Sequence, residues 1–153
     1  MNDPPLLFPS LEGTTLTSEA RAFPHAFAGA MNIVVVGFAK EQIAEVMSWV
    51  PFVERYVSGG AGVRAFLVVA LANGMKMMRR VIEPAMKAAV PAEARASTIV
   101  TFTDLNRLKT NLAIVSEKEL AIFVVDAVGT VRWRTSGAFD AAKGAALEGA
   151  LTV

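Results

Sequence analysis

The chain contains no cysteine among its 153 residues. This absence excludes disulfide bonds, thiolate nucleophiles and zinc–thiolate sites, because each of them needs a cysteine sulfur. Disulfide exchange and thiol-dependent peroxide reduction are therefore excluded by composition alone. The absence does not indicate a compartment, since a chain without thiols is indifferent to redox conditions.

Side chains for acid–base chemistry and metal binding are scarce as well. His25 is the only histidine, and its place between Pro24 and Ala26 is more typical of an ordinary surface position than of a general base. No His, Asp and Glu residues have the spacing of metal ligands. The sequence therefore predicts no catalytic residue, no metal and no cofactor.

Neither an excess of one charge nor a long apolar run is present. The formal net charge is +1, so no overall field attracts nucleic acid or an anionic membrane. The longest apolar run, at about 65–72, is too short to span a bilayer, and the first residues, MNDPPLLFPS, do not resemble a signal peptide. With 54% hydrophobic and 19% charged residues, the sequence predicts a folded cytoplasmic protein with no nucleic-acid partner and no membrane insertion.

The central elements follow from hydrophobic periodicity. Residues 32–38 and 63–70 are continuous apolar runs, which are typical of strands buried on both faces. Between them, residues 40–56 place apolar side chains three and four positions apart, as in a helix, and the glycine-rich segment 58–62 ends that helix. Strand, helix and strand in this order predict a parallel βαβ unit with a right-handed crossover.

The ends of the chain complete the predicted fold. The proline-rich segment 1–17 is expected to be irregular, and a short helix is expected from Thr17 or Ser18 to Ala28. The other predicted elements are helices at about 75–89, 104–110 and 139–151, and strands at about 97–102, 120–125 and 130–134. The sequence DAVG between the last two strands predicts a type I turn with a G1 bulge.

Together these elements predict one α/β domain over residues 1–153, with helices on a central mixed sheet of about four strands. Their order is the order of the thioredoxin topology.

The segment FAKEQIAEVMSWVP also resembles the active-site region of the thioredoxin-like superfamily. That region reads Phe, four residues, Cys-x-x-Cys, four residues and Pro. When Phe38 and Pro51 are aligned to it without a gap, the two cysteine positions fall on Ile43 and Val46. The resemblance implies a thioredoxin-like fold with a degenerate redox pair.

A second feature of catalytic thioredoxins is missing. They place a cis-proline just before the strand that enters the hairpin, where it holds an extended substrate peptide. In this chain Glu119 and Leu120 fill that place, and no proline follows Pro91. The resemblance therefore implies that the substrate groove of an oxidoreductase is absent.

Within the superfamily, two short motifs are similar to the mitochondrial ATP synthase assembly factor family often called ATP-ten. The first motif is SWVPF at 48–52, and the second is VRW at 131–133 followed by SG at 136–137. That family also has a thioredoxin-like domain without the redox pair. The resemblance implies a redox-inactive protein that binds other proteins, as an assembly factor or a chaperone, rather than an enzyme.

Two groups of side chains are candidates for binding a partner. Trp49, Phe52 and Tyr56 form an aromatic stripe on the first long helix, which is either a binding surface or a core face packed under the N-terminal segment. Arg132 and Arg134 are two residues apart on the last strand, so they lie on one side of it. They either bind an acidic partner or keep an edge strand solvated.

Two further functions stay open from the sequence. The apolar surface could serve a homodimer, so the predicted partner is either another protein or a second copy of the chain. Alternatively, an enzyme of unrecognised type could use a polar site near the start of the first long helix, at Lys40, Glu41 and Glu45. The solution mass tests the first alternative, and a ligand thermal-shift screen tests the second.

Overall fold

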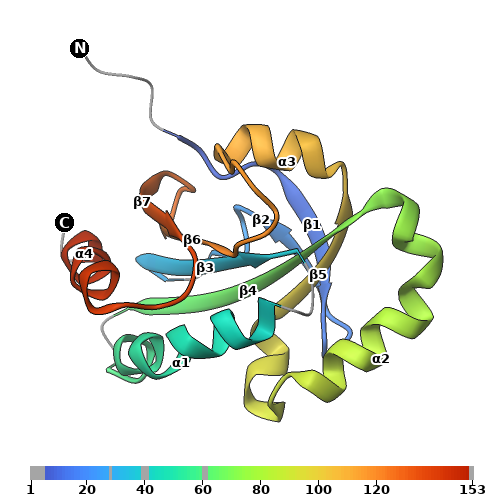
Figure 1. Cartoon of the computed structure of the whole chain (residues 1–153), viewed down its shortest axis with the longest axis horizontal. Coiled ribbons are helices and arrows are strands. Elements are labelled where there is room, and N and C mark those ends of the chain that lie inside the picture. Colours follow the sequence, from blue (N-terminus) through green and yellow to red (C-terminus); the bar gives the residue numbers. More distant parts are fainter. Residues whose placement is uncertain (1–5, 28, 39–41, 60–61, 152–153) are drawn as a thin grey trace.

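A computed structural model describes residues 6–27, 29–38, 42–59 and 62–151 (Figure 1). The strands in these ranges are β1 (Leu11–Thr15), β2 (Ala20–Phe23), β3 (Met31–Gly37), β4 (Val63–Ala72), β5 (Thr98–Thr103), β6 (Ala121–Asp126) and β7 (Val131–Ser136). The helices are α1 (Ile43–Ser58), α2 (Arg79–Ala89), α3 (Leu105–Leu112) and α4 (Ala141–Leu151), with short 3-10 helices η2 (Asn73–Met78) and η3 (Ala92–Ser97).

The strands form one mixed sheet in the order β2-β1-β5-β4-β3-β6-β7. Strand β3 pairs with β4, and β4 with β5, in parallel, whereas the other neighbours are antiparallel. The predicted βαβ unit is thus confirmed as β3-α1-β4. The sheet has seven strands rather than about four, and the two that were not predicted, β1 and β2, extend it beyond β5.

The N-terminal segment differs most from the prediction. Residues expected to be irregular form β1, and the helix expected from Thr17 or Ser18 to Ala28 is wrong, because β2 lies there. The hydroxyl of Thr15 accepts hydrogen bonds from the backbone N–H groups of Thr17 and Glu19, which closes a tight turn between the strands. Hydroxyl side chains that cap helices also stabilise turns in this way.

The two faces of the sheet are covered by different elements (Figure 1). Helix α3 and the N-terminal segment cover one face, and α1, α2 and α4 cover the other. The core of the α3 face includes Phe8, Phe27, Val34, Val36, Leu108, Leu112 and Phe123. The core of the α1 face includes Ile33, Val35, Trp49, Phe52, Ile122, Val124 and Leu147. Because strands β3 and β6 are covered on both sides, their sequences are apolar throughout.

The hairpin of β6 and β7 has the predicted turn. The Gly129 N–H donates to the Asp126 carbonyl over 3.1 Å, and Gly129 has a φ of 95°, which an L side chain rarely adopts. The Asp126 N–H in turn donates to the Thr130 carbonyl over 3.0 Å, so Gly129 and Thr130 both face Asp126, as a G1 bulge requires. A second bulge follows in β7, where the register shifts by one residue between Val124 and Val125.

Candidate functional site

The two degenerate redox positions lie on the first turn of α1. This helix begins at Ile43, soon after the end of β3, and Val46 is half-buried against the core of the α1 face. Thiols at such a place would sit at the positive end of a helix dipole, which lowers their pKa in redox enzymes. Here the same turn carries only aliphatic side chains at these two positions.

The start of α1 is tied to the loop before β6 by a residue that sequence reasoning missed. The side-chain oxygen of Gln42 accepts from the Phe38 N–H over 2.7 Å, and its amide nitrogen donates to the Glu117 carbonyl over 2.7 Å. Gln42 is only 5% exposed. The Glu117 carboxylate also pairs with Lys109 over 2.5 Å. The Gln42 amide therefore joins the end of β3 and the start of α1 to the loop before β6.

Most of the aromatic stripe on α1 is core. Trp49 is 0% exposed, and its indole N–H donates to the Gly137 carbonyl over 3.0 Å. The Phe139 ring lies 5.1 Å from both the Trp49 and the Phe52 rings. Of the two alternatives for Trp49 and Phe52, burial favours a core face over a binding surface, and the segment leading into α4 covers them.

The covering segment also differs from the expected one. The N-terminal segment packs on the opposite face of the sheet, where Phe8 lies 6.5 Å from Phe123. Tyr56, at the end of the stripe, is half-buried. Desolvation, followed by a hydrogen bond with Glu148, raises the pKa of the Tyr56 phenol. Tyr56 remains a candidate contact for a partner.

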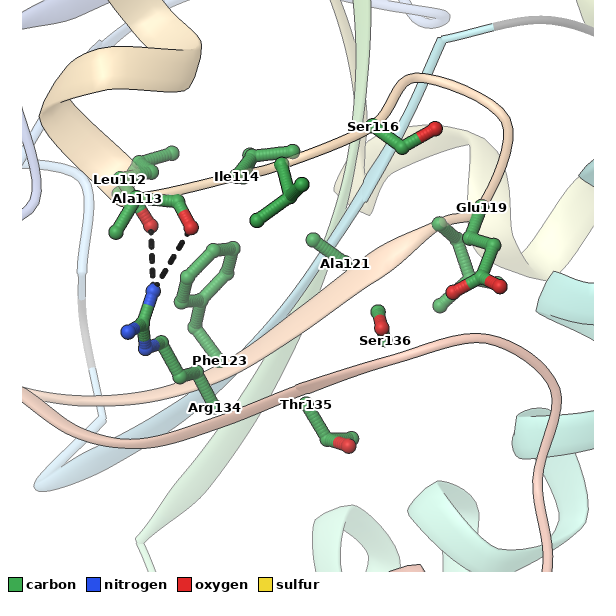
Figure 2. Close-up of a pocket in the computed structure, with 12 residues that line it drawn as sticks. Leu112, Ala113, Ile114, Ser116, Glu119, Ala121, Phe123, Arg134, Thr135 and Ser136 are labelled. Carbon is green, nitrogen blue, oxygen red and sulfur yellow. Dashed lines mark hydrogen bonds between the residues drawn. The ribbon is translucent and has the colours of Figure 1, made fainter.

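A pocket of about 440 Å³ lies between the loop before β6 and the β6–β7 hairpin (Figure 2). It is lined by Leu112, Ala113, Ile114, Val115, Ser116, Glu119, Leu120, Ala121, Phe123, Arg134, Thr135 and Ser136. Apolar side chains such as Ala121 and Phe123 line it from β6, and Glu119, Arg134 and hydroxyl groups line it from the surrounding segments. Val115 on the loop is 99% exposed.

Arg134 closes one end of this pocket (Figure 2). Its guanidinium donates to the carbonyls of Leu112 over 3.3 Å and Ala113 over 2.9 Å. These are the last carbonyls of α3, where Ala113 has a left-handed φ of 55°, and a cation is favourable at a helix C-terminus. The contact joins β7 to α3 and positions the loop above the pocket.

Arg132 has its partner within the hairpin. Its guanidinium lies 2.8 Å from the Asp126 carboxylate, which also accepts from the backbone N–H groups of Val128 and Thr130. Burial raises the pKa of Asp126, but the hydrogen bonds from Thr130, Arg132 and Val128 and the positive charge of Arg132 outweigh burial and lower it overall. Arg132 thus stabilises the turn, although its side chain stays largely exposed.

The lowered pKa of Asp126 predicts a specific pH dependence. A depressed pKa in the folded state adds stability above the unfolded value of about 3.9, and this contribution is lost as the pH falls through the folded pKa. We expect Asp126→Asn to lower the free energy of unfolding by about 1–2 kcal/mol at pH 7 and by less at pH 3. Urea denaturation at both pH values measures this, with the exposed Glu54→Gln as control. Equal losses at both pH values would contradict it.

The sequence offered three candidate residues for an enzyme site. Of these, Lys40 and Glu41 lie outside the described residues, and Glu45 is half-buried on α1. In the described part of the chain, no group of three or more His, Asp or Glu side chains could hold a metal ion. No helix there is long and apolar enough to cross a membrane.

Solved structures show the class of fold. BsSco, a member of the Sco family of cytochrome c oxidase assembly proteins, matches with a TM-score of 0.66 and 10% identity over 100% of this chain and 98% of its own. The exposed lipoprotein thioredoxin Etrx1 of Streptococcus pneumoniae matches with a TM-score of 0.63 and 12% identity, over 95% of this chain and 100% of its own. A thioredoxin-family thiol:disulfide interchange protein of Chlorobium tepidum matches with a TM-score of 0.57 and 14% identity, over 99% of this chain and 97% of its own. At these identities the matches show the fold alone, which is thioredoxin-like and confirms the predicted class.

A family comparison goes further than the fold. The family model described as ATP10 protein matches residues 2–148, so the chain belongs to this family of assembly factors for the ATP synthase. No curated protein sequence matches the chain significantly. The predicted family resemblance is confirmed. The predicted cytoplasmic location is wrong, because a mitochondrial ATP synthase assembly factor points to mitochondria.

Proposed function

We propose that the whole chain, residues 1–153, acts as one thioredoxin-like domain that binds a protein during ATP synthase assembly and catalyses no reaction. Membership of the ATP10 family and the absence of cysteine support this function. The observation that carries this proposal is the structure around the start of α1, where Ile43 and Val46 occupy the positions aligned with the redox cysteines. Gln42 bridges the start of that helix to the loop before β6, while the same loop forms the wall of an open pocket.

The chemistry of the pocket suits a polypeptide. Its floor offers aliphatic and aromatic side chains such as Phe123, its wall presents the fully exposed Val115, and its rim presents Arg134 and hydroxyl groups. Protein interfaces combine an apolar centre with a polar rim in this way, and arginine is enriched in them. Arg132, Arg134 and Tyr56 are therefore the candidate contacts that remain from the sequence, with Val115 added by the structure.

Complementation tests the proposal. Cells that lack the protein receive the wild-type chain, Val115→Asp or Val128→Asp, and assembled ATP synthase is measured by native electrophoresis at equal protein level. Val128 is a matched control, because it is also an exposed valine, 77% accessible, but lies in the β6–β7 turn outside the pocket lining. We expect Val115→Asp to lower the amount of assembled enzyme at least about threefold, since a buried unpaired charge at an interface costs well over 1 kcal/mol.

Two results would contradict the proposal at different points. If loss of the protein leaves ATP synthase assembly unchanged, the function itself is wrong. If Val115→Asp and Val128→Asp both restore assembly fully, the function stands but the pocket is not the binding site. The solution mass of each variant reports whether the surface instead joins two copies of the chain.

A further inference from the structure

We propose that the outer edge of β7 pairs with an extended segment of the partner polypeptide, a mode of binding that rests on the proposed function. Strand β7 is the last strand of the sheet. The Gly137 N–H donates to the Leu120 carbonyl over 2.9 Å. In an antiparallel pair, hydrogen-bonded and non-bonded positions alternate, so the backbone groups of Arg134 and Ser136 point away from β6. Among the described residues, no backbone group pairs with them.

The same edge already accepts a strand at its other end. The Val131 N–H donates to the Leu6 carbonyl over 2.8 Å, and the Phe8 N–H donates to the Gly129 carbonyl over 2.8 Å. Leu7 bridges to Thr130 in the antiparallel sense, so this edge is competent for strand pairing.

The chain's own N-terminal segment is poorly suited to continue that pairing. Positions 4 and 5 are prolines, which have no N–H to donate to a ladder. Among the described residues, no segment pairs with the edge from Arg134 to Ser136, so another polypeptide can pair there.

The pocket lies beside this available edge. Arg134 is opposite Phe123 in the register, so both side chains lie on the α3 face of the sheet. In Figure 2 the short Ser136 side chain lies between the longer side chains of Arg134 and Glu119. A strand added next to β7 places every second side chain on this face. One of the side chains of the added strand would then lie within reach of the pocket, and an apolar side chain matches the apolar residues that line it.

The positive charge of Arg132 and Arg134 favours a different polypeptide over a second copy of this chain at the edge of β7. Two copies of β7 paired in antiparallel would bring Arg132 and Arg134 of each copy together, and like charges at facing positions are unfavourable. A different chain can instead place a carboxylate next to these arginines. The preferred segment is thus an extended strand with an apolar and an acidic residue two positions apart, both on the α3 face.

The test uses the full chain and a library of linear peptides of about 12 residues, long enough for a strand of ordinary length with flanks. Selected peptides are measured on wild type, Ser136→Pro and Ser136→Ala. We expect Ser136→Pro, which removes the outward N–H, to weaken binding about tenfold or more. Ser136→Ala keeps that N–H and removes only one hydroxyl from the pocket rim, so we expect a change of about twofold at most. Amide exchange on the wild-type protein should show the Arg134 and Ser136 N–H groups becoming protected when peptide is added, whether or not Ser136→Pro folds.

Each other outcome overturns the pairing. Failure to select any peptide, protection at other segments with these two amides unchanged, or equal binding by Ser136→Pro would each do so. A stable dimer that Ser136→Pro dissociates would show that a second copy occupies the edge. In the complementation assay, full assembly with folded Ser136→Pro but not with Val115→Asp would reject the edge and leave the proposed function standing. Normal ATP synthase assembly in cells that lack the protein would reject the proposed function itself.

Discussion

Replacing Trp49 by alanine is expected to lower the free energy of unfolding by about 3–5 kcal/mol, the range for truncating a buried aromatic side chain. The indole is completely buried, packs edge-on against Phe139 and donates its N–H to the Gly137 carbonyl. Truncation would leave a cavity and an unpaired carbonyl between α1 and the segment before α4. Urea denaturation followed by circular dichroism measures the change.

The other tryptophan provides the control. Trp133 on β7 is half-buried against the same core, so Trp133→Ala is expected to cost only about 1–2 kcal/mol. If Trp49→Ala instead folded with wild-type stability and lost association with a partner, the indole would be a contact residue and its burial would be wrong.

Asn32→Leu is the second change with a large expected effect, about 3–5 kcal/mol. Asn32 is completely buried in β3. Its side chain accepts from the Gly29 N–H over 3.1 Å and donates to the carbonyls of Gly29 over 3.0 Å and Val125 over 3.2 Å. Leucine has a similar volume but removes all three bonds and leaves the buried N–H and carbonyl of Gly29 without their side-chain partner, at about 1–3 kcal/mol for each group that no water reaches.

Thr101→Val is the matched control for this change. Thr101 is also buried, but its hydroxyl makes one bond, to the Glu12 carbonyl over 2.6 Å. The expected cost is about 1 kcal/mol. The same denaturation series measures both variants, and equal costs would show that the number of bonds at Asn32 does not determine its contribution.

The parts of the fold that could be predicted are those whose patterns are local. The buried runs of β3 and β4 and the spacing of apolar residues in α1 differ clearly in period. Asp126 and Gly129 define their turn within four residues. Strands β1 and β2 were missed because they are short and half-exposed, and the threonines between them read equally well as a helix cap.

The site could be predicted only in part, because its decisive contacts are distant in sequence. The alternation on β7 correctly placed Arg132 and Arg134 on one side of the strand. No local signal shows that Phe139 would cover the aromatic face of α1, since a buried and an exposed aromatic stripe have the same spacing. The Gln42 bridge depends on Glu117, which is 75 positions away.

The path of the N-terminal segment has a consequence for the order of folding. Residues 6–8 pair at the edge of β7, and Thr14 pairs with Val100 of β5, so this segment crosses the sheet from one late strand to another. Contacts between residues so far apart form slowly, because a long loop must close before they are made. During synthesis, which starts at the N-terminus, residues 6–8 and Thr14 cannot pair until strands more than half the chain length away have been made. We expect the β3-α1-β4 unit to form before these contacts, and residues 6–15 to reach their final positions last.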